Sequence, residues 1–159
     1  MKTVIRAHYG SPDTLRVGEV PTPQPKAGQV LVRVHATTVN RTDCGGLWGR
    51  PFIYRFFVGF PKPRHIATGT DFAGEVVALG DGVTEFKVGD RVWGFDDHGA
   101  GSHAQYLAIS TKCPVAKIPD GVSYETAAAS MEGAHYTLNF INKVRLKPGQ
   151  RVLVYGATG

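Results

Sequence analysis

Cysteine, long apolar runs and a targeting signal are scarce or missing in this sequence. The 159 residues include 2 cysteines, and Cys44 and Cys113 have no framework spacing, so both should be free thiols rather than parts of a disulfide scaffold. No apolar run approaches the roughly 20 residues that a membrane helix needs. Residues 1–6 also lack the apolar core of a secretory signal. We therefore expect a cytoplasmic protein without a membrane partner.

Charge of one sign is not concentrated either. The formal net charge is +5, but the basic residues are scattered along the chain, which favours a solvated basic surface over a nucleic-acid interface. With 42% hydrophobic and 19% charged residues, the composition is that of an ordinary folded protein that can bury one substantial core. These features argue against disorder and predict no nucleic-acid partner.

Glycine and proline are abundant, with 20 and 10 residues, which is typical of many short strands joined by turns. Residues 69–94 organise the chain, because apolar side chains alternate over 72–79 and Gly80–Gly82 tolerates a turn with positive φ. Gly89–Asp90 is a second turn signal, after which Arg91–Phe95 resumes the sheet. This pattern predicts a small all-β barrel.

The rest of the chain predicts further strands and one helix. The prolines of Pro21–Pro25 lack a backbone N–H, so this stretch is an extended connector, with an interdomain linker as the alternative. Ser123 is a helix N-cap, and apolar residues from Met131 to Val144 recur at helical spacing. Strands are expected over residues 3–9, 15–20, 30–39, 101–109 and 113–119.

Polar side chains follow directly after the expected central strand over 30–39, and sites are often built at such places. Asn40 offers a hydrogen-bond donor and an acceptor together, although asparagine is also favoured as a cap of a turn. Asp43 is either a site residue or an N-terminal cap. Thr70 and Asp71 either line a cleft or end a strand.

The basic, aromatic segment over residues 50–65 allows three functional interpretations. Aromatic stacking and cationic phosphate contacts would suit a nucleic-acid platform, and a membrane-surface segment would need an amphipathic helix, which the prolines disfavour. The third interpretation is a lid over an apolar substrate pocket, while plain packing explains most of these aromatic residues. Tyr54 has a hydroxyl that can polarise a carbonyl group or donate a proton.

Five ordered motifs together resemble one known family. They are GQVLVRVHATTVNRTD, GTDFAGEVVALGDGVTEFKVGDRVWGF, GSHAQYLAI, AKIPDGVSYETAAA and LKPGQRVLVYGATG. In these motifs the chain is most similar to the N-terminal, GroES-like catalytic domain of the medium-chain dehydrogenase/reductase superfamily, in its zinc-independent quinone oxidoreductase and enone reductase-like branch. This resemblance implies a mainly β fold, a partly open antiparallel β-barrel with a C-terminal helix and the first strand of an absent Rossmann domain.

The resemblance also implies a division of the chain. Residues 1–146 would form the catalytic domain, without its returning C-terminal segment, and residues 147–159 would be the first strand and glycine turn of a truncated Rossmann domain. The turn glycines of such a domain let backbone amides approach pyrophosphate, so Gly156, Ala157 and Gly159 would contact the cofactor. We expect a fragment that is inactive alone. Its parent would transfer hydride from NADPH, or NADH, to a quinone or an α,β-unsaturated carbonyl compound.

The resemblance bears on metal binding as well. The zinc-dependent branch has a cysteine where this chain has Asn40, and a Gly-His-Glu motif where it has Thr70–Asp71, so we predict no metal. One alternative is a zinc-dependent alcohol dehydrogenase with relocated ligands. The other is a non-enzymatic GroES-like interaction domain, in which unpaired apolar strands drive self-association into a homo-oligomer. Relocated metal ligands would come from Cys44, His65, Asp71 or His103.

By the same resemblance, Asn40, Thr70 and Tyr54 would orient the substrate and stabilise the enolate that develops during hydride transfer. Asp43 would lie near the nicotinamide ribose and Arg41 near the cofactor phosphates. Tyr136 matches a position that is often threonine and lies near the nicotinamide amide. The catalytic set is thus Asn40, Asp43, Tyr54 and Thr70, and the cofactor-binding set is Asn40, Arg41, Tyr136, Gly156, Ala157 and Gly159.

Overall fold

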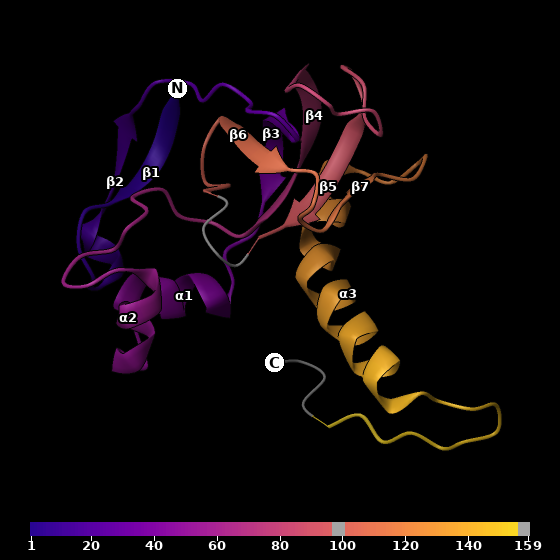
Figure 1. Ribbon diagram of the computed structural model, residues 1–159. Coiled ribbons are helices and arrows are strands. Elements are labelled where there is room, and N and C mark those ends of the chain that lie inside the picture. The colour runs from indigo at the N-terminus through magenta and orange to yellow at the C-terminus, as the bar shows by residue number, and fades with distance from the viewer. Residues whose placement is uncertain (97–100, 156–159) are drawn as a thin grey trace.

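Two antiparallel sheets form the framework of the protein, for which the computed structural model describes residues 1–96 and 101–155 (Figure 1). The smaller sheet pairs β1 (Lys2–Arg6) with β2 (Leu15–Glu19), and the 3-10 turn η1 (Pro12–Thr14) lies between them. The larger sheet has the order β6-β3-β4-β5-β7, and every neighbouring pair is antiparallel. Its strands are β3 (Gln29–Thr37), β4 (Asp71–Leu79), β5 (Arg91–Phe95), β6 (Tyr106–Ser110) and β7 (Val115–Lys117).

The larger sheet is open, with β6 and β7 at its edges. The prediction of a mainly β, partly open antiparallel fold with a C-terminal helix is confirmed, although no closed barrel forms within the described residues. Alternate residues of the central strands face one core, as the two-residue period of a strand requires. The buried side chains of this core are Val30, Val32, Phe72, Val76, Phe86, Val92, Leu107 and Ile109.

Helix α3 (Tyr124–Val144) covers part of the larger sheet. Ser123 is its N-cap, and the Ser123 side chain accepts a hydrogen bond from the Thr126 backbone N–H at 3.2 Å. The first turns bury Ala127 and Ala128 against the sheet, whereas the later turns run away from it (Figure 1). The capping residue and the helical period were therefore predicted correctly.

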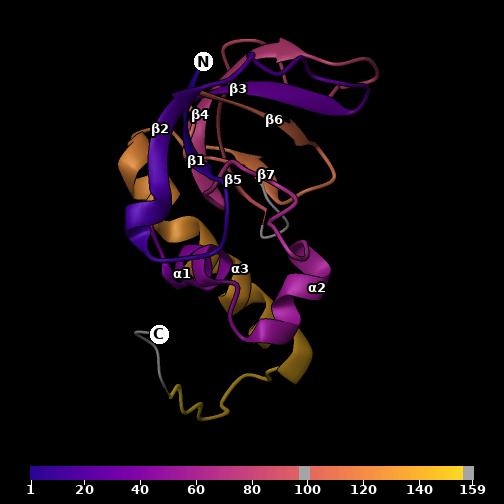
Figure 2. The same ribbon diagram turned by 90° about the vertical axis from the view of Figure 1, so that its left-hand side faces the viewer.

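The candidate site region is built from the short helices that follow β3. Helix α1 (Arg41–Trp48), the 3-10 turn η2 (Phe52–Tyr54) and helix α2 (Arg55–Val58) follow β3 in the chain. Both views place α1 and α2 together below the two sheets (Figures 1 and 2). Among the described helices, none has the length and apolarity needed to cross a bilayer.

One sequence-based expectation about strands was wrong in its bounds, and another stays a prediction. The strand expected over residues 101–109 begins only at Tyr106, because residues 101–105 leave the larger sheet to contact β1, where Val4 N–H donates to the His103 carbonyl at 2.8 Å. Residues 151–155 carry no secondary structure, so the Rossmann strand that the resemblance implies there stays a prediction. A parallel strand needs neighbouring strands for its backbone hydrogen bonds, and the described residues offer none there.

Candidate active site

Asn40 links the end of β3 to the start of α1 as a helix N-cap. Its Oδ1 accepts hydrogen bonds from the backbone N–H groups of Thr42 at 2.9 Å and Asp43 at 3.2 Å. In return, Asp43 Oδ2 accepts from the Asn40 backbone N–H at 3.0 Å. This reciprocal capping box satisfies N–H groups that the first turn of a helix leaves without intrahelical partners. The cap interpretation of Asn40 and Asp43 is therefore correct.

The other end of the Asn40 amide ties β3 to β4. Its Nδ2 donates to Asp71 Oδ2 at 2.8 Å and lies 3.3 Å from Thr70 Oγ1 and 3.4 Å from Thr38 Oγ1. Because an amide has two acceptor lone pairs and two N–H donors, these contacts use its full hydrogen-bonding capacity. Asn40 therefore fixes the positions of its neighbours instead of presenting a free polar group to a ligand.

Asp71 is a buried carboxyl group at the start of β4, with a side chain that is 1% exposed. Its Oδ2 accepts from Thr38 Oγ1 at 2.7 Å as well as from Asn40, while Oδ1 has no partner within the described residues. Burial raises the pKa of Asp71, and the nearby Glu132 carboxylate raises it further, against the lowering effect of the two hydrogen bonds. The group therefore holds its proton to a higher pH than an exposed aspartate.

Thr70 has the hydroxyl best placed to act on a ligand. It is 6% exposed, and its Oγ1 accepts the Asn40 amide hydrogen bond, so its own O–H remains available to donate. The side chain lines a small cavity of about 60 Å³. Thr42 lines the same cavity, but its hydroxyl donates to Glu132 Oε1 on α3 at 2.7 Å. Thr70 is thus an oriented hydroxyl donor at the cavity wall.

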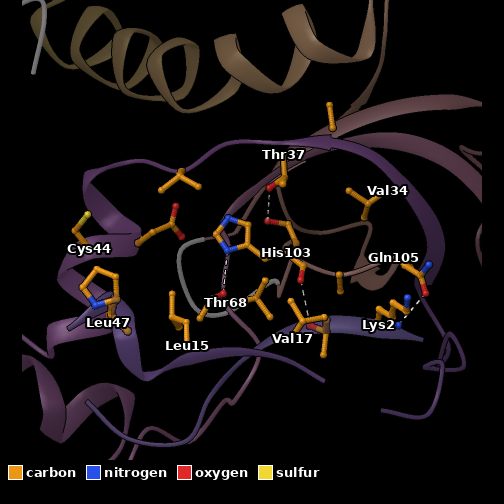
Figure 3. Close-up of a pocket in the computed structure, with 18 of the residues that line it drawn as sticks. Lys2, Leu15, Val17, Val34, Thr37, Cys44, Leu47, Thr68, His103 and Gln105 are labelled. Atoms are coloured by element: carbon orange, nitrogen blue, oxygen red, sulfur yellow. Dashed lines mark hydrogen bonds between the residues drawn. The ribbon is translucent and has the colours of Figure 1, made fainter. Parts of the chain in front are cut away.

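His103 holds together the two segments that carry Asn40 and Thr70. Its Nε2 lies 2.7 Å from the Thr38 carbonyl, and because a carbonyl only accepts, Nε2 carries the hydrogen. In the neutral ring, Nδ1 then accepts from Thr68 Oγ1 at 2.9 Å (Figure 3). Gly69 allows this approach, because a Cβ there would lie 2.9 Å from the His103 ring, and its φ is 97°.

His103 also lines an apolar cavity of about 620 Å³ between the smaller sheet, β3 and α1 (Figure 3). Sequence reasoning considered His103 as a relocated metal ligand or as an ordinary surface or core residue, and missed this bridging role. No spacing signal could have revealed it, because His103 is 35 residues from Thr68 and 65 from Thr38 in the chain.

Two cavities form a cleft beside α1. The small cavity shares Thr42, Gly46, Tyr54, Val58 and His65 with a wider one of about 840 Å³. The small cavity reaches inward to Thr70, and the wider one extends outward to Arg50 and Arg64. A ligand could therefore enter between α1 and α2 and reach the Thr70 hydroxyl.

The fold brings the four residues predicted to be catalytic into one region. Asp43, Tyr54 and Thr70 line the small cavity, and Asn40 is hydrogen-bonded to Thr70. The residues predicted to bind cofactor are more dispersed. Arg41 is exposed at the start of α1 and lines neither cavity of the cleft. Tyr136 is a residue of α3, and the centre of its ring lies 6.4 Å from the centre of the Phe95 ring. Gly156, Ala157 and Gly159 lie outside the described residues.

Across residues 1–96 and 101–155, no three histidine, cysteine, aspartate or glutamate side chains are arranged to hold a metal ion. The residues considered as relocated zinc ligands are either hydrogen-bonded to other groups or exposed. Both ring nitrogens of His103 have hydrogen-bond partners, and Cys44 is exposed on α1. Asp71 Oδ2 receives two hydrogen bonds.

Comparison with known proteins identifies the family. Residues 26–120 match the alcohol dehydrogenase GroES-like domain. The chain belongs to this family. It is 32% identical over 167 residues to human quinone oxidoreductase, covering 100% of this chain and 46% of that protein. It is also 34% identical over 158 residues to a chloroplastic quinone-oxidoreductase homolog of Spinacia oleracea, covering 94% and 46%. The recognition of the medium-chain dehydrogenase/reductase superfamily and its quinone oxidoreductase-like branch is confirmed.

Solved structures agree with this GroES-like assignment. The quinone oxidoreductase from Coxiella burnetii aligns with a TM-score of 0.79 and 27% identity, over 94% of this chain and 46% of that one. A mycobacterial protein complexed with NADPH aligns with a TM-score of 0.76 and 28% identity, over 95% of this chain and 43% of that one. The chain thus spans about half the length of the relatives it matches.

Proposed function

We propose that this GroES-like chain forms the substrate-binding wall of a zinc-independent, NADPH-dependent oxidoreductase that reduces quinones or α,β-unsaturated carbonyl compounds. The observation that carries the proposal is the Thr70 hydroxyl, which Asn40 orients toward a cavity that Tyr54 also lines. Relatives named quinone oxidoreductase and the NADPH complex of a similar protein support the reaction and the cofactor. A small-molecule quinone or enone is the substrate class, and a cytoplasmic location belongs to the same proposal.

The reaction needs a group that stabilises negative charge on the substrate oxygen. When bound, the nicotinamide supplies a hydride to the β-carbon of the enone. Thr70 donates its O–H to the carbonyl oxygen, where charge develops as the hydride arrives, and this interaction strengthens in the transition state. Asn40 holds the Thr70 oxygen in place and Tyr54 lines the same cavity.

The described residues fit only the reacting end of a nicotinamide cofactor. A phosphate cradle needs free backbone N–H groups at a helix N-terminus, but the Asn40 side chain already accepts from the first such groups of α1. Residues 156–159, which carry the glycines expected to contact the phosphates, lie outside the described residues. Because the chain spans about half of its relatives, we propose that the remaining half holds most of the cofactor.

A chimera tests this function. Joining the 159-residue chain to the remaining part of a quinone oxidoreductase relative should give NADPH oxidation with an enone such as methyl vinyl ketone. Thr70→Val should lower kcat about a hundredfold, as expected for loss of one oxyanion donor, whereas Thr70→Ser should keep most activity. A zinc chelator should have no effect. An unchanged kcat in Thr70→Val, or inactivation by the chelator, would contradict the proposal.

The isolated chain provides the complementary measurement. It should oxidise no NADPH above background, because in this proposal most of the cofactor is held by the half of its relatives that the chain does not cover. Substantial turnover by the purified chain alone would show that the proposed division of labour is wrong.

A further inference from the structure

Arg6 places a buried guanidinium group in the wall of the small cavity. The residue ends β1, is 8% exposed, and lines the cavity together with Tyr54 and Thr70. The predicted catalytic and cofactor-binding residues did not include it. Its position is notable because arginine is rarely buried unless an opposite charge or several hydrogen bonds accompany it.

The contacts of Arg6 leave its hydrogen-bonding capacity partly unused. Its Nη2 donates to the His65 carbonyl at 3.3 Å, and its guanidinium carbon lies 5.7 Å from the Tyr9 ring centre. Its Nε is buried and has no partner within the described residues. Burial lowers the pKa of Arg6, and the negative charge of the Asp43 carboxylate opposes this effect. No ion pair joins Arg6 to a carboxylate in the described part of the chain.

We propose that Arg6 and Thr70 together form an oxyanion site, in which the Arg6 guanidinium group and the Thr70 O–H bind the substrate oxygen. This inference deepens the proposed function and depends on it for its catalytic meaning. The oxygen enters as a neutral carbonyl and gains a full negative charge as the enolate forms. A guanidinium hydrogen bond to a charged oxygen is stronger than one to a neutral oxygen, so Arg6 stabilises the enolate more than the substrate.

The size and surroundings of the cavity suit this role. A volume of about 60 Å³ corresponds to roughly two water molecules, which is enough for a carbonyl group but not for a nucleotide. The wider cavity outside it is lined by Arg50 and Arg64, both exposed. Neither forms an ion pair within the described residues. Arginine side chains thus lie in the walls of both cavities, with the Asp43 carboxylate also in the wall of the small one, and their positive charge supports charge development on oxygen.

Acetate is a suitable probe, because it is a small planar oxyanion that mimics the enolate, and acetamide is its neutral counterpart. In NMR spectra of the isolated chain, the Arg6 Nε–H resonance should shift saturably with acetate and not with acetamide. Arg6→Gln should weaken acetate binding about tenfold or more, since a charge-assisted donor is lost. Arg16→Gln should bind acetate normally, because Arg16 is exposed on β2 of the same small sheet.

Several outcomes would overturn the inference. If acetate causes no saturable shift in the wild-type chain, or acetamide causes an equal one, Arg6 only ties β1 to residue 65. Undiminished acetate binding in a folded Arg6→Gln variant would have the same meaning. Should that variant fail to fold, the wild-type titration and a Thr70→Val titration still decide. Acetate binding without turnover in the chimera would refute the proposed function and leave the oxyanion site standing.

Discussion

At the scale of single residues, Asp71 shows how the polar network and the stability of the fold are linked. Its Oδ2 is bound by Thr38 and Asn40, but its Oδ1 is buried without a partner in the described structure. Burying a charge in this way costs free energy, and the raised pKa expresses that cost. The carboxyl group therefore positions Asn40 at the expense of stability at neutral pH.

Replacing Asp71 by asparagine should raise the free energy of unfolding at neutral pH by about 1 kcal/mol, near the lower end of the cost of burying an unsatisfied polar group. The folded-state pKa lies above the ordinary value of 3.8, so the folded protein takes up a proton before the unfolded chain does as pH falls. The difference in the free energy of unfolding between Asp71→Asn and the wild type should therefore shrink as the pH falls toward 3.8. Urea unfolding at both pH values measures it, and a constant gap would contradict the prediction.

Sequence reasoning reached some of these residues and not others. Asn40 and Asp43 could be predicted as a cap, because Asn-x-x-Asp after a strand is a local signal. The roles of Arg6 and His103 could not be predicted, because their partners are distant in sequence and only the folded chain brings them together. The unused hydroxyl of Thr70 likewise depends on where the Asn40 amide points.

At the scale of elements, α3 has the strongest local signals and was the easiest to predict. The Ser123 cap and the spacing of apolar residues after it are both local in sequence. The edge strands were harder, since β7 spans Val115–Lys117 within the expected 113–119. An edge strand has one neighbour, so pairing with β5 sets its length; after Lys117 one more hydrogen bond joins the Ile118 N–H to the Arg91 carbonyl at 2.9 Å, and Pro119 then has no N–H to donate.

Ser123→Ala should lower the stability of the chain by about 1 kcal/mol, because the Thr126 N–H at the start of α3 loses its acceptor. Ser130→Ala is the matched control on the same helix. The Ser130 hydroxyl bonds back to the Thr126 carbonyl at 2.9 Å, a contact that slightly disfavours the helix. Thermal unfolding followed by circular dichroism compares the two, and an equal loss of stability in both variants would argue against the cap.

At the scale of the whole molecule, the open architecture was predictable from the ordered motifs, but the end of the chain was not. The sequence over 151–155 has the apolar pattern of a buried strand. Such a pattern predicts a strand only where neighbouring strands are present to pair with it. Within the described residues the segment instead exposes Leu153 to 92% and Tyr155 to 97%. Exposed apolar groups of this kind promote association.

The isolated chain should therefore self-associate at tens of micromolar concentration, because burying these side chains between copies removes apolar surface from water. The double change Leu153→Lys and Tyr155→Lys should restore a mass near 17.1 kDa in sedimentation experiments. Val88→Lys is the control, since Val88 is also apolar and exposed but lies in the turn before β5. It should associate as the wild type does. A wild-type chain that stays monomeric over this range, or a Val88→Lys variant that dissociates equally, would show that residues 151–155 do not drive the contact.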